Sequence, residues 1–267
     1  MKNKEYFKKL CKVLIWPIIF VIGQVFIQYI FVAIYNKKEF NNLTKSQFLK
    51  YINTNEYKDK LNTYITSDKI VLLMLLILCI IFIPILFKQF KKYKSKSKLS
   101  TKALVVPILL GISISLIYNI SVFNLNNIVF FTHNYDVNNK NLMITVISSA
   151  ILGPILEELI FRGIIYNKLK EFNKPIRAIV LQSIIFALFH DNILNAIYAF
   201  MVGFMFTYVY EKYNNLISSI VLHISLNLTI VLMFNIIIKN NIILNFSLVI
   251  ISILTLLILN NSIKKDI

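Results

Sequence analysis

The sequence has little charge, and this shortage excludes an ordinary soluble domain. Only 15% of its 267 residues are charged, while 57% are hydrophobic. Soluble globular domains carry about 25% charged residues. The length alone would allow one or two soluble domains. An excess of apolar residues gathered into long runs instead predicts a chain that has lipid as its solvent.

Acidic residues are scarcer still: 12 Asp and Glu stand against 29 Lys and Arg, for a formal net charge of +17. A charge of this size can indicate nucleic-acid binding, but the lysines cluster beside the ends of apolar runs and form no basic groove with interleaved aromatics. Basic residues beside membrane segments stay preferentially in the cytoplasm, where they attract anionic lipid. The charge therefore predicts contact with a lipid bilayer and no nucleic-acid partner.

The chain has only two cysteines, and no repeat is visible in it. Cys11 precedes the first apolar run and Cys79 lies inside the second, so neither a disulfide framework nor a cysteine metal cluster is indicated. The absence of internal repeats argues mildly against an inverted-repeat transporter. The first apolar run is too long for a signal-peptide core and lacks a small-residue cleavage site, which predicts a membrane anchor.

The apolar runs predict an all-α, polytopic membrane helix bundle of about eight transmembrane helices. Both lysine-rich links within the chain fall on one side, which places both termini in the cytoplasm. The expected helices cover Val13–Tyr35, Ile70–Phe87, Ala103–Leu125, Leu142–Tyr166, Ala178–His190, a sixth run ending at Tyr210, Leu216–Ile238 and Ile242–Leu259.

A dense run of lysines, Lys88–Lys102, divides the chain into two parts. Residues 1–102 are expected to form two N-terminal helices, joined by an external polar loop over 36–69 that can hold a short interfacial helix. Residues 103–267 are expected to form the core that carries the site. The fifth expected helix is short for a full crossing and is followed directly by Asp191 and Asn192, so it is predicted to stop within the bilayer or end in a polar cavity.

The fourth expected helix holds three ionisable side chains, each of which costs about 2.5 kcal/mol or more in mid-bilayer. Glu158 and Arg162 are four residues apart and share a face, so they are predicted to neutralise each other. Glu157 points about 100° away and has no partner on its own helix. The preceding pair Gly153-Pro154 can bend the helix. Glu157 therefore needs a partner from another helix.

Two later helices offer polar partners: His190, which follows Phe186 at i, i+4 spacing, and the pair His223 and Asn227 at the same spacing. Counted from the expected cytoplasmic ends, Glu157 and His223 lie about 13 Å deep and His190 near 20 Å. A carboxylate in a poorly solvated site can accept a proton at neutral pH, so Glu157 and His190 are predicted to activate a water molecule. His223 and Asn227 suit the donors that stabilise an oxyanion.

Three motifs, in this order, resemble those of the CAAX-protease and bacteriocin-processing family. They are Glu157-Glu158-x-x-Phe161-Arg162-Gly163, Phe186-x-x-x-His190 and His223-x-x-x-Asn227. The resemblance covers residues 142–235, with 1–102 outside it. It implies a multi-helix intramembrane endopeptidase in which the first glutamate and the histidines are catalytic and the arginine is structural.

The composition resembles that of the bacterial members of this family, which are linked to peptide processing, bacteriocin self-immunity and signalling. The resemblance therefore implies a multi-pass protein of the bacterial cytoplasmic membrane whose partner is a small membrane-associated peptide or protein. A prenylated CAAX substrate is not carried over, because nothing in the chain indicates a pocket for a prenyl group.

A metal-dependent mechanism is the alternative for the same residues. Glu157, His190 and His223 would offer zinc or another divalent metal one carboxylate and two imidazoles. The chain lacks the H-E-x-x-H helix that places two histidines on one turn, and Asn227 is a poor zinc ligand. The metal-free mechanism, with no cofactor, is therefore preferred.

Two other functions fit the intramembrane polar residues. A transporter or proton relay also places carboxylates and histidines inside the bilayer. A non-catalytic immunity or scaffold protein of the same fold would bind a partner within the membrane. A binding protein has little reason to keep the glutamate, the arginine, both histidines and the asparagine of the motifs, so peptide hydrolysis is preferred.

Overall fold

A computed structural model describes residues 3–41, 43–93, 99–125, 141–190 and 192–236. Every regular element in these residues is a helix. Four helices are long and apolar enough to cross a membrane: Lys4–Glu39, Asp68–Phe90, Leu142–Lys170 and Ile193–Tyr213. Three shorter apolar helices accompany them. The predicted all-α, polytopic membrane bundle is thereby confirmed, while its expected last helix, Ile242–Leu259, lies outside the described residues.

The other seven expected helices are present, most of them with shifted ends. They correspond to α1 (Asn3–Glu39), α4 (Asp68–Phe90), α5 (Lys102–Leu125), the continuous run Leu142–Lys170, α9 (Pro175–Ala187), α10 (Ile193–Tyr213) and α11 (Leu216–Ile236). α1 and α4 run beyond their apolar stretches at both ends because lysines and glutamates continue a helix well once it has begun.

The run Leu142–Lys170, here called the central helix, is continuous but not uniformly α-helical. It consists of α6 (Leu142–Thr145), η2 (Val146–Leu152), α7 (Gly153–Ile160), η3 (Phe161–Tyr166) and α8 (Asn167–Lys170). The segments η2 and η3 are π-helical, and they flank α7, which carries both glutamates. Such wide turns inside α-helices are frequent at functional sites.

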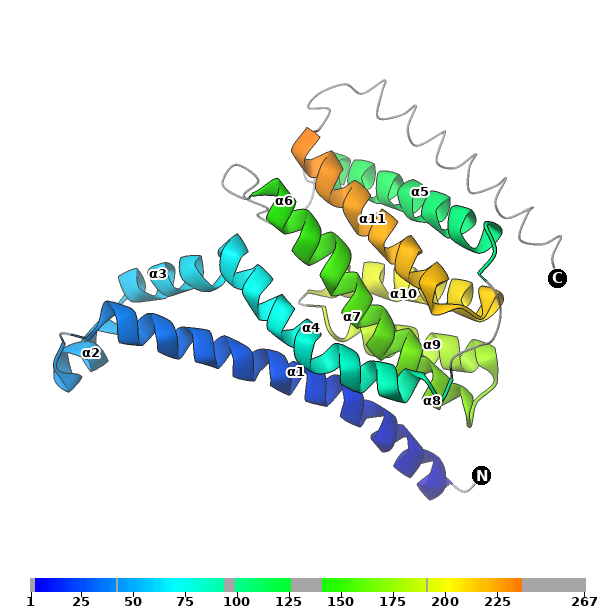
Figure 1. The fold of residues 1–267 in the computed structure, drawn as a ribbon, viewed down its shortest axis with the longest axis horizontal. Coiled ribbons are helices and arrows are strands. Elements are labelled where there is room, and N and C mark those ends of the chain that lie inside the picture. Colours follow the sequence, from blue (N-terminus) through cyan, green and yellow to red (C-terminus); the bar gives the residue numbers. More distant parts are fainter. Residues whose placement is uncertain (1–2, 42, 94–98, 126–140, 191, 237–267) are drawn as a thin grey trace.

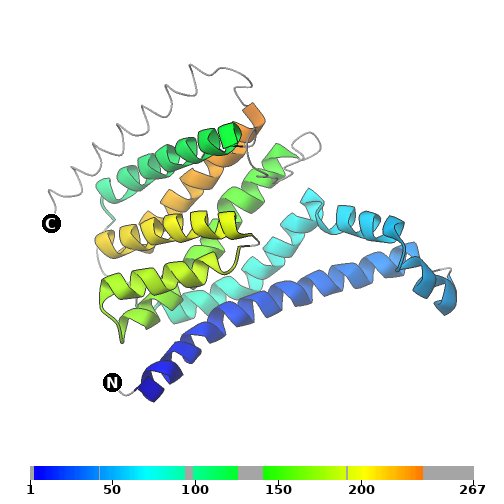
Figure 2. The same ribbon diagram turned by 180° about the vertical axis from the view of Figure 1, so that it is seen from behind.

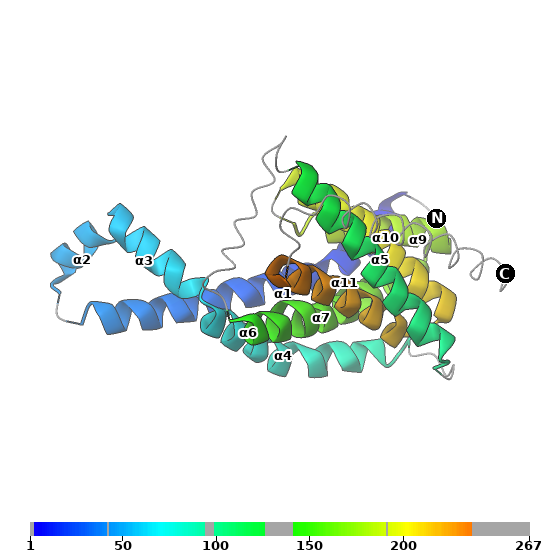
Figure 3. The same cartoon turned by 90° about the horizontal axis from the view of Figure 1, so that it is seen from above.

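The central helix lies in the middle of the bundle (Figure 1). It packs against α4 on one side and α11 on the other, and α5 lies along α11. Viewed from above, α4 and α5 are on opposite sides of the central helix and α11 (Figure 3). From behind, α9 and α10 lie side by side across the central helix (Figure 2). Glu157 and Glu158 are thus surrounded by helices from both halves of the chain.

Segment 36–69 forms two short helices that extend beyond the bundle at the end of α1 (Figure 1). These are α2 (Lys45–Tyr51) and α3 (Asn55–Ile65). The Thr44 side chain and Gln47 form a capping box at the start of α2, which satisfies backbone N–H groups that have no partner in the helix. The predicted short helix is present, and its position at a membrane interface stays a prediction.

The helix α9 has 13 residues and is therefore about 20 Å long, against about 30 Å for the hydrocarbon core of a bilayer. The chain then turns, and the Asn192 side chain accepts a hydrogen bond from the Asn195 N–H (2.8 Å) at the start of α10. This length agrees with the prediction that the fifth helix stops short of a full crossing. His190 lies in the turn.

The helix α5 approaches α11 very closely at Gly111. A Cβ atom added to Gly111 would lie 2.5 Å from the Leu222 carbonyl oxygen and would overlap Ser225 Oγ. We expect Gly111→Ala to push α11 outward at a cost of about 1–3 kcal/mol, measured as lower thermal stability in detergent. Gly163→Ala is the matched control, since its Cβ would meet the movable Phe90 ring at 3.3 Å and the Glu158 carbonyl oxygen at an ordinary contact distance of 3.7 Å. Equal stability of both variants would contradict this close contact.

Candidate active site

A fully buried ion pair stands at the centre of the bundle. Arg162 Nη1 donates to Glu158 Oε1 over 2.9 Å, and both side chains have no exposed surface. The pair predicted from the i, i+4 spacing is therefore present. Neither charge could remain in this apolar interior alone, because a buried charge without a partner is strongly destabilising.

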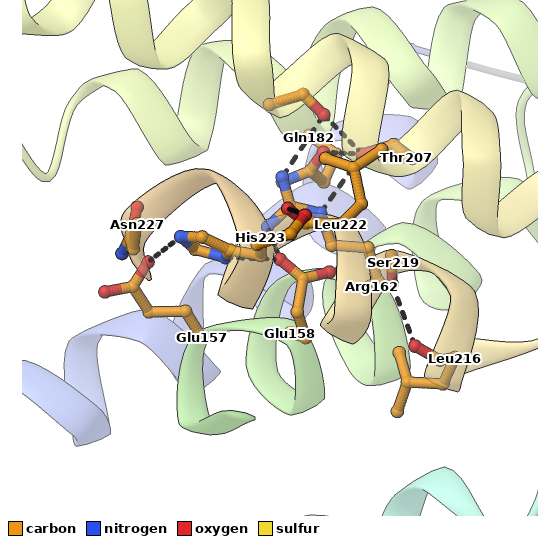
Figure 4. A network of polar contacts seen from close by, with 12 residues as sticks. Glu157, Glu158, Arg162, Gln182, Thr207, Leu216, Ser219, Leu222, His223 and Asn227 are labelled. Carbon is orange, nitrogen blue, oxygen red and sulfur yellow. Dashed lines mark hydrogen bonds and ion pairs between the residues drawn. The ribbon is translucent and has the colours of Figure 1, made fainter. Parts of the chain in front are cut away.

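The guanidinium group of Arg162 is held on its other edge by α10. Nη2 donates to the Gly203 carbonyl oxygen (3.2 Å) and Nε to Thr207 Oγ1 (3.3 Å). The rings of Phe186 and Phe206 lie over the guanidinium carbon, with centroids at 4.6 and 5.0 Å, which adds cation–π attraction. Arg162 thus joins the central helix to α9 and α10 (Figure 4).

His223, on α11, is oriented by the same carboxylate. Its Nδ1 lies 2.9 Å from Glu158 Oε1, and its ring stacks on Phe206 with a centroid distance of 4.4 Å. An ionised carboxylate can only accept hydrogen bonds, so Nδ1 carries the proton. In the neutral imidazole, Nε2 is then left with a free lone pair.

Glu157 faces that free nitrogen (Figure 4). Its Oε2 atom lies 3.9 Å from His223 Nε2, and its side chain is 36% exposed, in contrast to the fully buried Glu158. This separation is too long for a direct hydrogen bond, but a water molecule about 2.8 Å from both atoms would bridge them at an angle of about 90°. The partner that Glu157 needs from another helix is therefore His223.

Asn227 lies one turn beyond His223 and donates from Nδ2 to the Ser149 carbonyl oxygen at 3.0 Å. The preceding carbonyl, of Ser148, accepts the Gly153 N–H in the π-helical pattern. The next donor in that pattern would be residue 154, which is proline and has no N–H. Asn227 therefore donates to the Ser149 carbonyl oxygen in place of the N–H that Pro154 lacks. The second proton of the Asn227 amide group remains available for another acceptor.

This contact predicts that Asn227 and Pro154 are energetically coupled. We expect Asn227→Ala to cost about 1 kcal/mol of stability, since it leaves the half-buried Ser149 carbonyl without this donor. In the Pro154→Ala variant, the new N–H at residue 154 can donate to the Ser149 carbonyl oxygen. Asn227→Ala should therefore reduce the stability of this variant much less than that of the wild type. A double-mutant cycle on thermal unfolding measures the coupling, and strict additivity would contradict it.

His190 lies apart from the other predicted catalytic residues. It is exposed in the turn after α9, and its Nδ1 is 3.1 Å from the Phe186 carbonyl oxygen. The Phe186 ring is 5.1 Å from the His190 ring and 6.4 Å from the His223 ring, centroid to centroid. The structure thus brings Glu157 and His223 together and places His190 beside Phe186, which also contacts His223.

The same geometry does not favour the alternative metal site. Within the described ranges, no three His, Cys, Asp or Glu side chains are arranged to hold a metal ion together. Glu157 and His223 lie near each other, but His190 makes its hydrogen bond and ring contacts with Phe186. The three residues named for zinc therefore do not form a ligand set in this arrangement.

Two buried polar residues of the site were missed by sequence reasoning. Thr207 and Gln182 have no exposed surface, and the Thr207 hydroxyl bonds Gln182 Oε1. Gln182 is an amide in an otherwise apolar run, and Thr207 follows Gly203 at i, i+4 spacing. Both features can be seen in the sequence. Single Thr and Gln residues, however, commonly form hydrogen bonds between neighbouring membrane helices, so neither residue indicated a contact with Arg162.

The fold and the site define a class: a polytopic helical membrane protein with a buried glutamate–arginine–histidine network and a second, partly exposed glutamate. Residues 139–229 match the family model of the Type II CAAX prenyl endopeptidase Rce1-like proteins. This match spans every predicted site residue, from Glu157 to Asn227. The predicted resemblance is confirmed: over this segment, the chain is similar to the CAAX-protease and bacteriocin-processing family.

Two curated bacterial proteins are similar over the same region. The "Putative membrane peptidase YdiL" of Bacillus subtilis (strain 168) is 34% identical over 88 residues, which are 33% of this chain and 36% of that protein. The "UPF0177 protein YxdF" of Lactococcus lactis subsp. lactis (strain IL1403) is 36% identical over 80 residues, 30% of this chain and 44% of that protein. The matches thus cover less than half of either relative. No solved structure is significantly similar to this chain.

Proposed function

We propose that this protein is an intramembrane endopeptidase that hydrolyses a peptide bond in a small membrane-associated protein or peptide. The observation that carries the proposal is the pairing of Glu157 with His223. His223 Nδ1 is bound by a buried carboxylate at 2.9 Å, and its free Nε2 faces the Glu157 carboxylate at 3.9 Å. Two proton acceptors on separate helices thus share a space suited to one water molecule.

In the proposed reaction, that water donates hydrogen bonds to Glu157 and His223. Glu157 takes a proton as the water oxygen bonds to the scissile carbonyl carbon, and the carbonyl oxygen becomes an oxyanion. When the oxyanion collapses, the C–N bond breaks and the leaving amine receives the proton from Glu157. Donors for the oxyanion are the remaining amide proton of Asn227 and the imidazole of His190.

This scheme exchanges the two histidines relative to the prediction from the sequence, which paired His190 with Glu157 and His223 with Asn227. The supporting geometry is that His223, and not His190, lies beside Glu157, while the exposed His190 can reach a substrate. His190 would then approach the substrate from the end of α9.

We expect the hydrolysis to need no metal, since the described donors do not form a three-ligand set. Prolonged treatment with a chelator should change the cleavage rate by less than about twofold, whereas a catalytic metal site would lose its activity with its metal. Loss of cleavage that zinc restores would instead support the Glu157, His190 and His223 ligand set.

The proposed site of action is the bacterial cytoplasmic membrane, because the two relatives of the segment described above are bacterial and the basic links indicate a cytoplasmic side. Mass spectrometry of membranes from wild-type cells and a Glu157→Ala strain tests the proposal. An uncleaved precursor, such as a bacteriocin-like peptide, should accumulate only in the variant. Glu56→Ala, at an exposed glutamate of α3, is the control. Identical peptides in all three strains would favour a non-catalytic immunity or scaffold role.

A further inference from the structure

The buried side of the site contains a contact that the reaction scheme does not use. The Thr207 hydroxyl has two acceptors in reach, Gln182 Oε1 and the Gly203 carbonyl oxygen at 2.8 Å, and its oxygen accepts from Arg162 Nε at 3.3 Å. All of these groups are buried. Thr207 thus links α9, α10 and the central helix through a single hydroxyl group.

The contacts continue from Thr207 to the reacting atoms without a gap. Arg162 donates hydrogen bonds from Nε and Nη2 to residues of α10, and from Nη1 to Glu158. Glu158 Oε1 receives both this N–H and the Nδ1–H of His223, each at 2.9 Å. A shift of the guanidinium would therefore move the carboxylate oxygen that fixes the imidazole.

Besides the hydrogen bond at Nδ1, the main contact that orients the His223 imidazole is its stacking on a neighbouring ring. Its ring face stacks on Phe206, which limits tilting but leaves rotation within the ring plane to the hydrogen bond at Nδ1. Rotation within that plane changes the distance between Nε2 and Glu157 Oε2. The position of the proposed water therefore depends on the hydrogen bond from His223 to Glu158, which is connected through Arg162 to Thr207.

We propose that Thr207 is a positioning residue for peptide hydrolysis, acting through Arg162 and Glu158 to hold His223 Nε2 toward Glu157. This inference rests on the proposed peptidase function. A purely structural Thr207 would fill the same space and satisfy Arg162, with no effect on His223. The two roles differ in what happens when only the hydroxyl is removed.

The test compares isosteric and conservative variants of the purified full chain. Thr207→Val should lower kcat by about 10²-fold with little change in KM, since misplacement of a reacting group by about 1 Å has an effect of this size. Thr207→Ser keeps the hydroxyl and should stay within about threefold of wild type. Thr145→Val is the matched control, because Thr145 is also buried and its hydroxyl has no partner among the described residues.

A second readout does not require catalysis. The chain has three histidines, His133, His190 and His223, so ¹⁵N-labelled imidazoles give few signals, and His223→Gln assigns the one of interest. Wild type and Thr207→Ser should show His223 protonated at Nδ1, whereas Thr207→Val should show a mixture of tautomers. An unchanged tautomer or an unchanged kcat in Thr207→Val would overturn the inference. A wild-type protein that cleaves nothing would overturn the peptidase proposal, and the imidazole signals would still decide the role of Thr207.

Discussion

Glu157→Gln should abolish measurable peptide cleavage while leaving the protein folded. The amide cannot accept the proton of the attacking water, and loss of a general base costs about 10²–10⁴-fold in rate. Stability should change little, because the side chain is 36% exposed and the buried contacts among Glu158, Arg162 and His223 do not involve it. Steady-state cleavage of the accumulated precursor by purified protein measures the loss, and thermal unfolding measures the stability.

The control for this variant is Glu56→Gln, which makes the same change at an exposed surface pair with Lys60. It should retain full activity, since surface ion pairs contribute little. Wild-type rates in Glu157→Gln would remove the general base from the proposed reaction, even if the protein proved to be a peptidase. Unfolding of Glu157→Gln would show that Glu157 holds the bundle together, contrary to its exposed position.

Arg162→Met should be the most destabilising single substitution in the site. It leaves the Glu158 carboxylate buried and without its cation, and breaking a buried pair in this way costs about 3–5 kcal/mol. Methionine keeps much of the length and apolar stem of arginine, so the loss would come from the charge and its hydrogen bonds. The midpoint of thermal unfolding in detergent, together with the yield of folded protein, measures the effect.

The double variant Glu158→Gln with Arg162→Met separates stability from activity. Removing both charges avoids the unpaired carboxylate, and neutral replacements of buried pairs are often tolerated, so much of the stability should return. Cleavage should not return, because the glutamine amide no longer presents an ionised oxygen to His223 Nδ1. A double variant as unstable as Arg162→Met would show that packing around the arginine, and not charge balance, dominates.

Several features of the fold followed from local sequence. The lengths of the apolar runs predicted the long apolar helices of the described residues, and the short fifth run predicted the short helix α9. The ends of α1 and α4 were less predictable because charged residues continue a helix as readily as they end it. The two π-helical segments of the central helix were not predicted, although Gly153-Pro154 marked the place where regular hydrogen bonding had to change.

The sequence by itself determined the pair of Glu158 with Arg162, because four residues on one helix bring two side chains together whatever surrounds them. It also determined that Glu157 required a partner from elsewhere. Only the tertiary structure decided that this partner is His223, that Phe186 lies beside His190, and that Thr207, itself bonded to Gln182, holds the arginine. The reason is physical: helices that are apolar on all sides carry no pattern that specifies their rotation or depth relative to one another, so packing sets both.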